Sequence, residues 1–192
     1  MASPKILVFA GSTRTGALSA KLAALAAKEL AIADAEVTKI SLADYPLPIY
    51  NGDLEQEKGI PENAVKLARL IAAQQGVFIA TPEYNNSLPP LLKNAIDWVS
   101  RNKSGPNGIP FRNKVYGVGS TSDGLIGGAR ALIELRRVVQ AGLGAILIPE
   151  KIEISRAQDA FDEAGELTAE APAKLLKALC RHLVDLSRRL AD

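Results

Sequence analysis

The sequence has one cysteine and one histidine among its 192 residues. One cysteine cannot form an internal disulfide bond or supply a cysteine-based zinc site. No apolar run reaches the ~18 residues that a membrane-spanning helix needs. No block of Lys and Arg marks a surface for nucleic acid, and the net charge is only +2. We therefore expect no bound metal, no membrane insertion and no nucleic-acid partner.

Acid–base machinery is also scarce. Cys180 and His182 stand two residues apart in a helical pattern, so their side chains point to different sides and cannot act as a pair. No pair of carboxylates stands out either. The chain itself offers little chemistry, so we expect no catalytic side chain and infer that a bound cofactor carries the reaction.

The composition is that of an ordinary soluble protein, with 47% apolar and 23% charged residues. A chain of this length can bury one full core. The N-terminus runs from Met1 to Lys5 straight into an apolar run, which leaves no room for a signal peptide. We expect a single domain over residues 1–192, located in the cytoplasm.

Short apolar runs alternate with stretches of helical periodicity. Strands are expected at residues 5–10, 37–42, 77–80, 115–119 and 145–148, the last closed by Pro149. Helices are expected at 18–30, 61–72, 90–101, 132–139 and 176–190, with a loop at 104–108. This alternation predicts a parallel sheet with helices on both faces. Five short strands favour an α/β, flavodoxin-like doubly wound five-stranded sheet over a barrel, which needs about 250 residues.

The connection from Asp44 to Pro61 is long for a compact α/β domain. Its first part, residues 44–52, holds two Tyr, a Leu and an Ile, which is unusually apolar for a surface loop. A contiguous apolar patch suggests a partner surface, so we expect a homodimer or a homotetramer. The alternative is that these residues fold back onto their own sheet.

A polar loop follows the first expected strand, with the sequence Gly11-Ser12-Thr13-Arg14-Thr15-Gly16-Ala17-Leu18-Ser19. Backbone N–H groups at a helix start attract anions, and the hydroxyls and the arginine add donors, so a phosphate is the natural ligand. The P-loop pattern fails, because Ala17-Leu18 stands where Lys-Ser/Thr is needed, and Gly-x-Gly-x-x-Gly is absent. The phosphate of a mononucleotide is therefore expected here.

A second loop follows the third expected strand, with the sequence Thr81-Pro82-Glu83-Tyr84-Asn85-Asn86-Ser87-Leu88-Pro89. A polar, proline-bounded loop at a strand end is where an open α/β sheet presents its ligand site. Its tyrosine, amides and backbone N–H groups suit a planar heteroaromatic ligand. Packing is the alternative role for Tyr84. In the helix that follows, Trp98 is expected in the core, and Asp97 and Arg101 are expected to form a solvated pair.

The combination resembles the NADPH-dependent FMN reductases, a family that includes bacterial quinone, chromate and azo-dye reductases. The resemblance spans nearly the whole chain. Its strongest elements are the Gly11-Ser12-x-Arg14 and Pro82-Glu83-Tyr84-Asn85 segments, supported by residues 92–98 and 127–131. Any one of these is weak, but four in this order are specific.

By that resemblance, the first loop surrounds the FMN phosphate with Gly11, Ser12, Arg14, Ala17, Leu18 and Ser19. The flavin ring and ribityl chain are lined by Pro82, Glu83, Tyr84 and Asn85. The pyrimidine side is closed by the segment that contributes Ser120, Thr121, Ser122 and Gly124. The chain departs from the family at Ala17 and Ser19, where Ser and Asn are common.

The resemblance also implies an FMN-dependent NAD(P)H oxidoreductase. Hydride passes from NADPH or NADH to the flavin, and quinones, chromate, ferric complexes or azo dyes then take the electrons. One open face that serves both partners implies ping-pong kinetics. The alternative is a flavodoxin-type electron carrier, but such carriers are usually strongly acidic and this chain is not.

Overall fold

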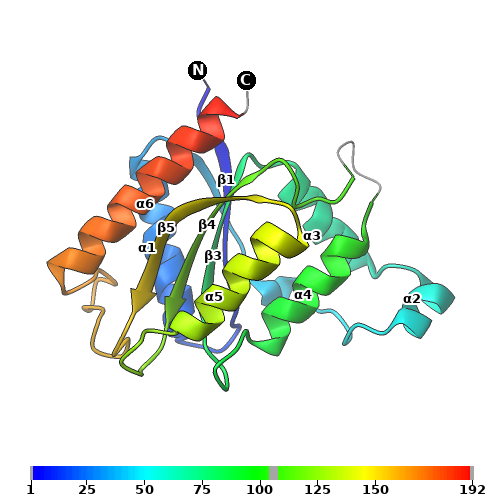
Figure 1. The fold of residues 1–192 in the computed structure, drawn as a ribbon, viewed down its shortest axis with the longest axis horizontal. Coiled ribbons are helices and arrows are strands. Elements are labelled where there is room, and N and C mark those ends of the chain that lie inside the picture. The colour runs from blue at the N-terminus through cyan, green and yellow to red at the C-terminus, as the bar shows by residue number, and fades with distance from the viewer. Residues whose placement is uncertain (1, 104–107, 191–192) are drawn as a thin grey trace.

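Five parallel strands form the centre of the computed structural model, which describes residues 2–103 and 108–190 (Figure 1). Their order across the sheet is β2-β1-β3-β4-β5, which confirms the expected flavodoxin-like fold. Residues 104–107 of the expected loop lie outside the described part. The strands are β1 (Lys5–Ala10), β2 (Glu36–Lys39), β3 (Gly76–Pro82), β4 (Val115–Thr121) and β5 (Ile146–Ile154).

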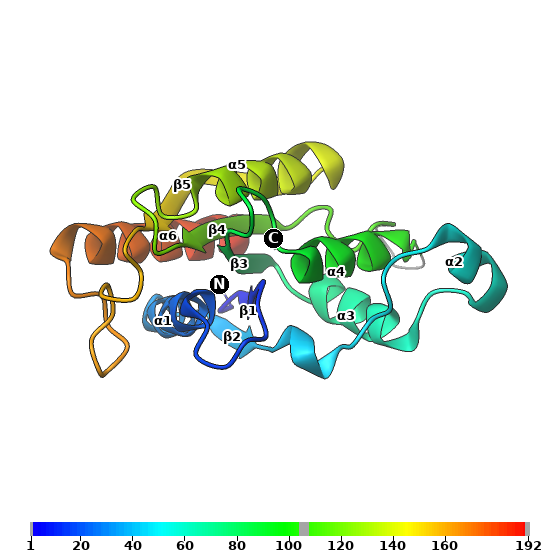
Figure 2. The ribbon, with the colours of Figure 1, turned by 90° about the horizontal axis from the view of Figure 1, so that it is seen from below.

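Helices cover both faces of the sheet (Figure 2). Helices α1 (Leu18–Ile32) and α6 (Glu170–Arg189) pack on one face, where they bury Ile6 and Val8 of β1. Helices α3 (Glu62–Ala72), α4 (Pro90–Arg101) and α5 (Ala129–Arg137) pack on the other, where they bury Leu7 and Phe9. This alternation follows the two-residue period of a strand. Among the described residues, no helix combines the length and the apolar content that crossing a membrane requires.

The last strand does not end at Pro149, as the sequence analysis expected. β5 continues to Ile154, and its register against β4 shifts between Tyr116 and Val118. A proline lacks the N–H that a ladder bond needs, so within sheets it is confined to edge strands and bulges. Pro149 meets both conditions, because β5 is at the edge of the sheet and the irregularity falls beside it.

Two further differences lie between β1 and α3. β2 ends at Lys39, and Leu42 is buried instead in a short 3₁₀ helix, η1 (Leu42–Asp44). A seven-residue helix, α2 (Gly52–Lys58), interrupts the long connection and lies away from the sheet in both views (Figures 1 and 2). It buries no residue, so no apolar period marks it in the sequence. At the end of α5, residues 138–142 continue as one π-helical turn, η2 (Val138–Gly142).

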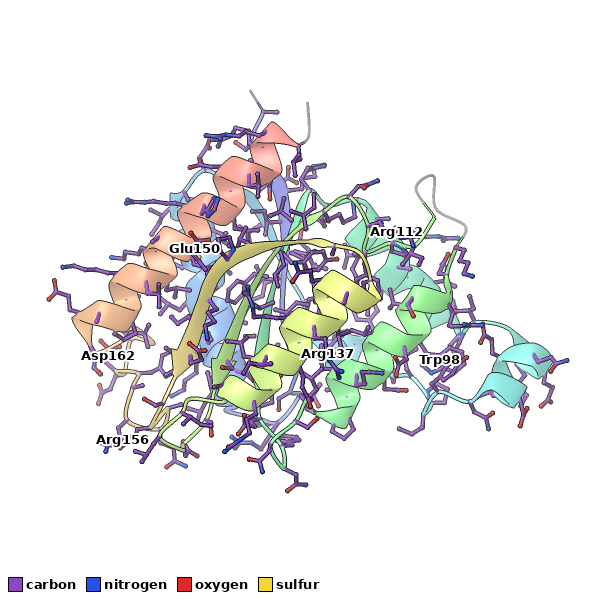
Figure 3. All side chains as sticks on the ribbon, viewed as in Figure 1. Trp98, Arg112, Arg137, Glu150, Arg156 and Asp162 are labelled. Atoms are coloured by element: carbon purple, nitrogen blue, oxygen red, sulfur yellow. The ribbon has the colours of Figure 1, made fainter. Side chains whose placement is uncertain are left out.

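The apolar part of the connection folds back onto α4. The indole Nε1 of Trp98 donates to the carbonyl of Pro48 at 2.8 Å, and the edge of Tyr50 packs against the indole with ring centres 4.9 Å apart. Trp98 is fully buried, as expected, and lies between α4 and the connection (Figure 3). Only one large apolar side chain of this segment, Ile49, is strongly exposed, at 75%. Most of the segment therefore folds back onto its own chain, with Pro48 and Tyr50 against helix α4.

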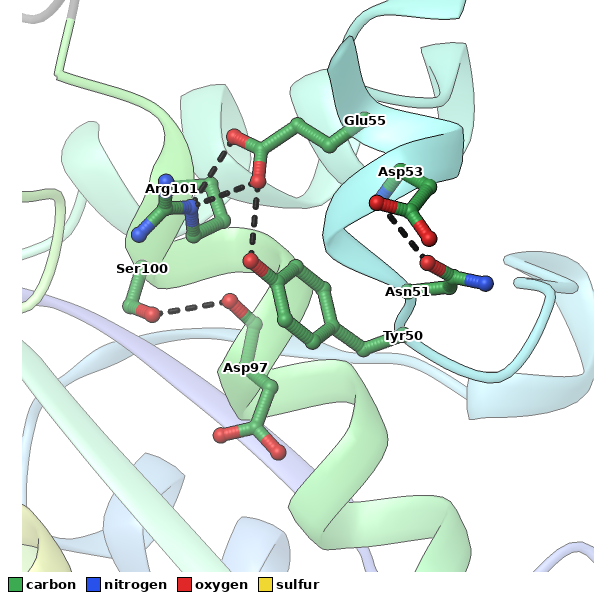
Figure 4. Close-up of polar contacts among 7 residues, drawn as sticks. All are labelled: Tyr50, Asn51, Asp53, Glu55, Asp97, Ser100 and Arg101. Atoms are coloured by element: carbon green, nitrogen blue, oxygen red, sulfur yellow. Dashed lines mark hydrogen bonds and ion pairs between the residues drawn. The ribbon is translucent and has the colours of Figure 1, made fainter. Parts of the chain in front are cut away.

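A polar cluster holds α2 against the end of α4 (Figure 4). Arg101 donates from Nε to both carboxylate oxygens of Glu55 at 2.9 Å, and the hydroxyl of Tyr50 donates to Glu55 at the same distance. The Arg101 guanidinium keeps the pKa of the Glu55 carboxyl below its usual range. Asp97 instead binds Lys93 at 2.7 Å, so the expected Asp97–Arg101 pair is wrong.

We predict that Trp98→Phe lowers the free energy of unfolding by about 2 kcal/mol. The change removes the hydrogen bond to Pro48 and leaves a small cavity under the connection. Urea denaturation measures the difference, with Ile49→Ala as the control because that side chain is exposed. Equal stabilities for Trp98→Phe and the wild type would show that the indole does not anchor the connection.

Candidate functional site

The loops that follow β1, β3 and β4 meet at the carboxyl ends of these parallel strands, at the bottom of Figure 1. They enclose a pocket of about 220 Å³. Every residue that lines it, except Asp123, is one that the sequence analysis selected. These residues are Ser12, Arg14, Ala17, Leu18, Ser19, Pro82, Glu83, Tyr84, Thr121, Ser122 and Asp123.

The first loop offers unpaired donors at the start of α1. Ala17 stands at the N-cap position and its side chain forms no capping bond. The Ser19 side chain is buried, and its hydroxyl is without a hydrogen-bond partner among the described residues. Such a group is costly to bury unless something else satisfies it. Because Ser19 lines the pocket, a ligand oxygen is the natural partner for its hydroxyl.

The charge at this loop is positive. Arg14 is exposed and has no ion-pair partner within the described ranges, and its backbone N–H donates to the Ser12 hydroxyl at 3.3 Å. A helix start, an arginine and a buried hydroxyl are together the donor set of a phosphate site. The residues present therefore fit the phosphate of a mononucleotide such as FMN.

The second loop is a tight two-residue turn. Asn85 and Asn86 adopt left-handed backbone conformations, with φ of 50° and 63°. Tyr84 and Ser87 exchange both backbone hydrogen bonds, at 3.0 and 3.1 Å. Asparagine is among the few residues that accept two successive positive φ values, so the Asn85-Asn86 pair explains why the chain reverses here. The turn presents Tyr84 to the pocket, 45% exposed, with its hydroxyl 3.4 Å from that of Ser12.

The carboxylate of Glu83 binds another helix. One of its oxygens accepts the backbone N–H groups of Arg130 and Ala131, at 3.0 and 3.1 Å. The Glu83 side chain is only 9% exposed. Glu83 thus lines the pocket and at the same time satisfies the first turn of α5.

The third loop, between β4 and α5, is fixed by its own polar groups. The buried Ser120 hydroxyl donates to the carbonyl of Gly127 at 2.7 Å, and the Ser122 hydroxyl accepts the N–H of Gly124 at 3.1 Å. Gly127 has a φ of 62°, and a Cβ there would come within 2.9 Å of the backbone at Ile154. Only glycine fits this approach.

Four of the predicted site residues, Gly11, Asn85, Ser120 and Gly124, do not line the pocket. Gly11 pairs instead with β3, through its N–H to the carbonyl of Ala80 at 2.8 Å. Asp123 lines the pocket but is not among the predicted site residues; its carboxylate accepts the backbone N–H and the side-chain amide of Gln158. No local pattern marks a contact across 35 residues.

The remaining reactive side chains lie outside the pocket. Cys180 is buried in α6, where its sulfur is 3.8 Å from the carbonyl of Ala26, and burial raises the pKa of its thiol. The ring of His182 binds the carboxylate of Glu150 at 2.7 Å. Within residues 2–103 and 108–190, no group of three or more His, Cys, Asp or Glu side chains is placed to hold a metal ion.

Comparisons with known proteins point to one family. The family model described as NADPH-dependent FMN reductase matches residues 4–159. A quinone reductase of Escherichia coli is 39% identical over 136 residues, covering 70% of this chain and 69% of that protein. An NAD(P)H-dependent FMN reductase of Pseudomonas aeruginosa is 35% identical over 189 residues, covering 97% and 96%. The solved structure of FerB, a flavoenzyme NAD(P)H:(acceptor) oxidoreductase from Paracoccus denitrificans, superposes with a TM-score of 0.76 at 30% identity, covering 97% and 98%.

Proposed function

The chain belongs to the NADPH-dependent FMN reductase family, and from that premise we propose that it transfers electrons from NAD(P)H to quinones by a ping-pong mechanism. It is an oxidoreductase that depends on FMN and uses NAD(P)H. Bound FMN supplies the chemistry, since it accepts hydride from a nicotinamide and passes electrons to a second substrate. We also propose that residues 1–192 form one FMN-binding domain and that it works in the cytoplasm, where NAD(P)H is supplied.

The observation that carries this proposal is the buried hydroxyl of Ser19, which has no partner in the described part of the chain and stands beside an uncapped helix start. We propose that Ser12, Arg14 and Ser19, with the backbone N–H groups of residues 18 and 19, hold the FMN phosphate. The segment 82–85 would line one side of the flavin ring and residues 121–124 the other. Because no side chain of the pocket is placed as an acid–base pair, these residues act by binding, orientation and electrostatics.

Exposed apolar side chains on the loops and first helical turn beyond β3 and β4 favour an apolar, planar acceptor. Tyr84 and Leu91 follow β3, and Leu125 and Ile126 follow β4. Quinones match this surface better than small inorganic ions do. Chromate and ferric complexes are further acceptors that we propose on the family resemblance. Donor and acceptor would use the same open side of the pocket in turn, which gives ping-pong kinetics.

Anaerobic titration tests the proposed function. We expect the protein reconstituted with FMN to lose its visible flavin absorption on addition of NADPH or NADH, and to regain it on addition of a benzoquinone. Initial rates at several quinone concentrations should give parallel double-reciprocal lines. A bound flavin that NADPH and NADH alone do not bleach would favour the electron carrier instead, and a protein that binds no FMN would refute both.

We predict that Arg14→Ala weakens FMN binding by about 10- to 100-fold. The loss corresponds to one charge-assisted hydrogen bond to phosphate, about 1.5–3 kcal/mol. Fluorescence titration measures the Kd. Arg69→Ala is the matched control, because Arg69 is exposed near the end of α3. That end of α3 lies just before the start of β3, whereas the pocket lies beyond the other end of this strand. Equal FMN affinities for the two variants would show that Arg14 does not hold the FMN phosphate.

We also propose that the protein is a homodimer or a homotetramer. The segment 44–52 contributes less apolar surface than its composition suggests, because Tyr50 is bound to Glu55 and Trp98. Ile49 stays 75% exposed next to this anchored stretch, which suits a partner surface.

Light scattering at micromolar concentration should give at least about twice the 20.4 kDa mass of one chain. We predict that Ile49→Asp lowers this mass and slows quinone turnover, because a partner beside the pocket would be lost. Ile32→Asp is the control, since Ile32 is 67% exposed at the far end of α1. A monomer mass for the wild type would refute the proposed dimer or tetramer.

A further inference from the structure

Two carboxylates tie the loop of residues 82–88 to α5 in opposite directions. Glu83 on the loop accepts the backbone N–H groups of Arg130 and Ala131 on the helix, at 3.0 and 3.1 Å. Glu134 on the helix accepts the hydroxyl of Ser87, and the backbone N–H of Leu88 at 3.3 Å, on the loop. The ties bracket the Tyr84–Ser87 turn, one before it and one at its end.

A third contact joins the same partners. Arg130 donates from its guanidinium to the side-chain oxygen of Asn86 at 3.0 Å and lies 4.0 Å from the Glu83 carboxylate. The turn is therefore held before, at and after its tip. The hydrogen bonds from Ser87 and Leu88 lower the pKa of the Glu134 carboxyl, so this tie persists at neutral pH.

The start of α5 is itself fixed to the other wall of the pocket. Gly128 occupies the N-cap position in a left-handed conformation and carries no capping side chain. Just before it, the carbonyl of Gly127 accepts the hydroxyl of Ser120 at the end of β4. Glu83 therefore connects the second loop to the third, through the first turn of α5.

We propose that Glu83 is a positioning residue that sets the spacing between the Tyr84 turn and the loop of residues 121–124. This inference rests on the proposed function, in which those two segments flank the flavin ring. A carboxylate suits the role because one oxygen accepts two N–H groups at once and a helix start favours negative charge. The charge is directed at the helix start, so the tie adds no free anion to the ring site.

The position of Glu83 separates this role from simple helix capping. An ordinary N-cap belongs to the chain just before its helix, whereas Glu83 precedes Arg130 by 47 residues. Loss of its carboxylate would uncap α5 and release the loop together. The substitution Glu83→Gln would keep an oxygen acceptor in place, so it should keep the spacing while removing the charge.

The test compares Glu83→Ala, Glu83→Gln and Asp162→Ala. Asp162 is a matched control, because its carboxylate also accepts a backbone N–H in a loop, from Glu166 at 2.8 Å, and it does not line the pocket (Figure 3). Each variant is measured for thermal stability, FMN Kd, the midpoint potential of bound FMN, and kcat and KM with NADPH and a benzoquinone.

We expect Glu83→Ala to raise the FMN Kd by about 10-fold or more, the equivalent of one well-formed contact, and to shift the midpoint potential. Glu83→Gln should restore the Kd to within about 3-fold of wild type, because it keeps an acceptor for the two N–H groups. Asp162→Ala should lose only thermal stability. Ser87→Ala removes one of the two hydrogen bonds that Glu134 accepts from the loop, so its Kd should rise less than that of Glu83→Ala.

Unchanged FMN affinity and potential in Glu83→Ala, with a loss of stability like that of Asp162→Ala, would overturn the inference. If Glu83→Ala does not fold, a Kd in Glu83→Gln that rises by more than about 3-fold overturns it, because that variant keeps the acceptor that sets the spacing. A wild type that binds no FMN or does not oxidise NADPH refutes the proposed function before any variant is compared. An active wild type, together with Glu83 variants whose FMN affinity and midpoint potential are unchanged, refutes only the role of Glu83.

Discussion

Parallel pairing of β1 with β3 is the contact on which the site depends. Ala10 stands opposite Ala80, and the N–H of Gly11 continues the ladder to the carbonyl of Ala80. The first loop therefore leaves the sheet beside the strand that leads into the second loop. A Cβ at Gly11 would come within 3.1 Å of the Leu92 side chain in α4, so a larger residue here would require Leu92 to shift. The strand order then places β4 and the third loop on the other side of β3.

Polar groups around the pocket divide into those that hold the loops and those left for a ligand. The carboxylates of Glu83, Glu134 and Asp123 all accept backbone N–H groups of neighbouring segments. The hydroxyl of Ser120 is likewise used within the protein. Among the described residues, the pocket groups without a partner are at the start of α1, where they are the Ser19 hydroxyl and the Arg14 charge. Negative charge is therefore directed into the scaffold, and donors are directed into the pocket.

Local patterns predicted the strands and most of the pocket, because a buried strand and the loop that follows it are contiguous in the sequence. The sequence could not show that Pro149 lies within an edge strand, since this depends on the register of β5 against β4. It also could not show what Glu83 and Asp123 bind, because their partners lie 47 and 35 residues away. Helix α2 was not predicted for another reason. It has no buried face, so its Asn51 cap is the only signal in the sequence.

Helix α4 links the pocket to the long connection. Its first turns follow the second loop and place Leu92 against Gly11, while its last turns carry Trp98 and Arg101, which hold the connection. The Arg101–Glu55 pair contributes stability fully above pH ~4.5, the ordinary pKa of Glu, because the folded pKa of Glu55 lies below it. That contribution is lost as the pH falls through the folded value. Acid therefore weakens the attachment of the connection to the last turns of α4. The first turns of α4 are packed in the core beneath the site.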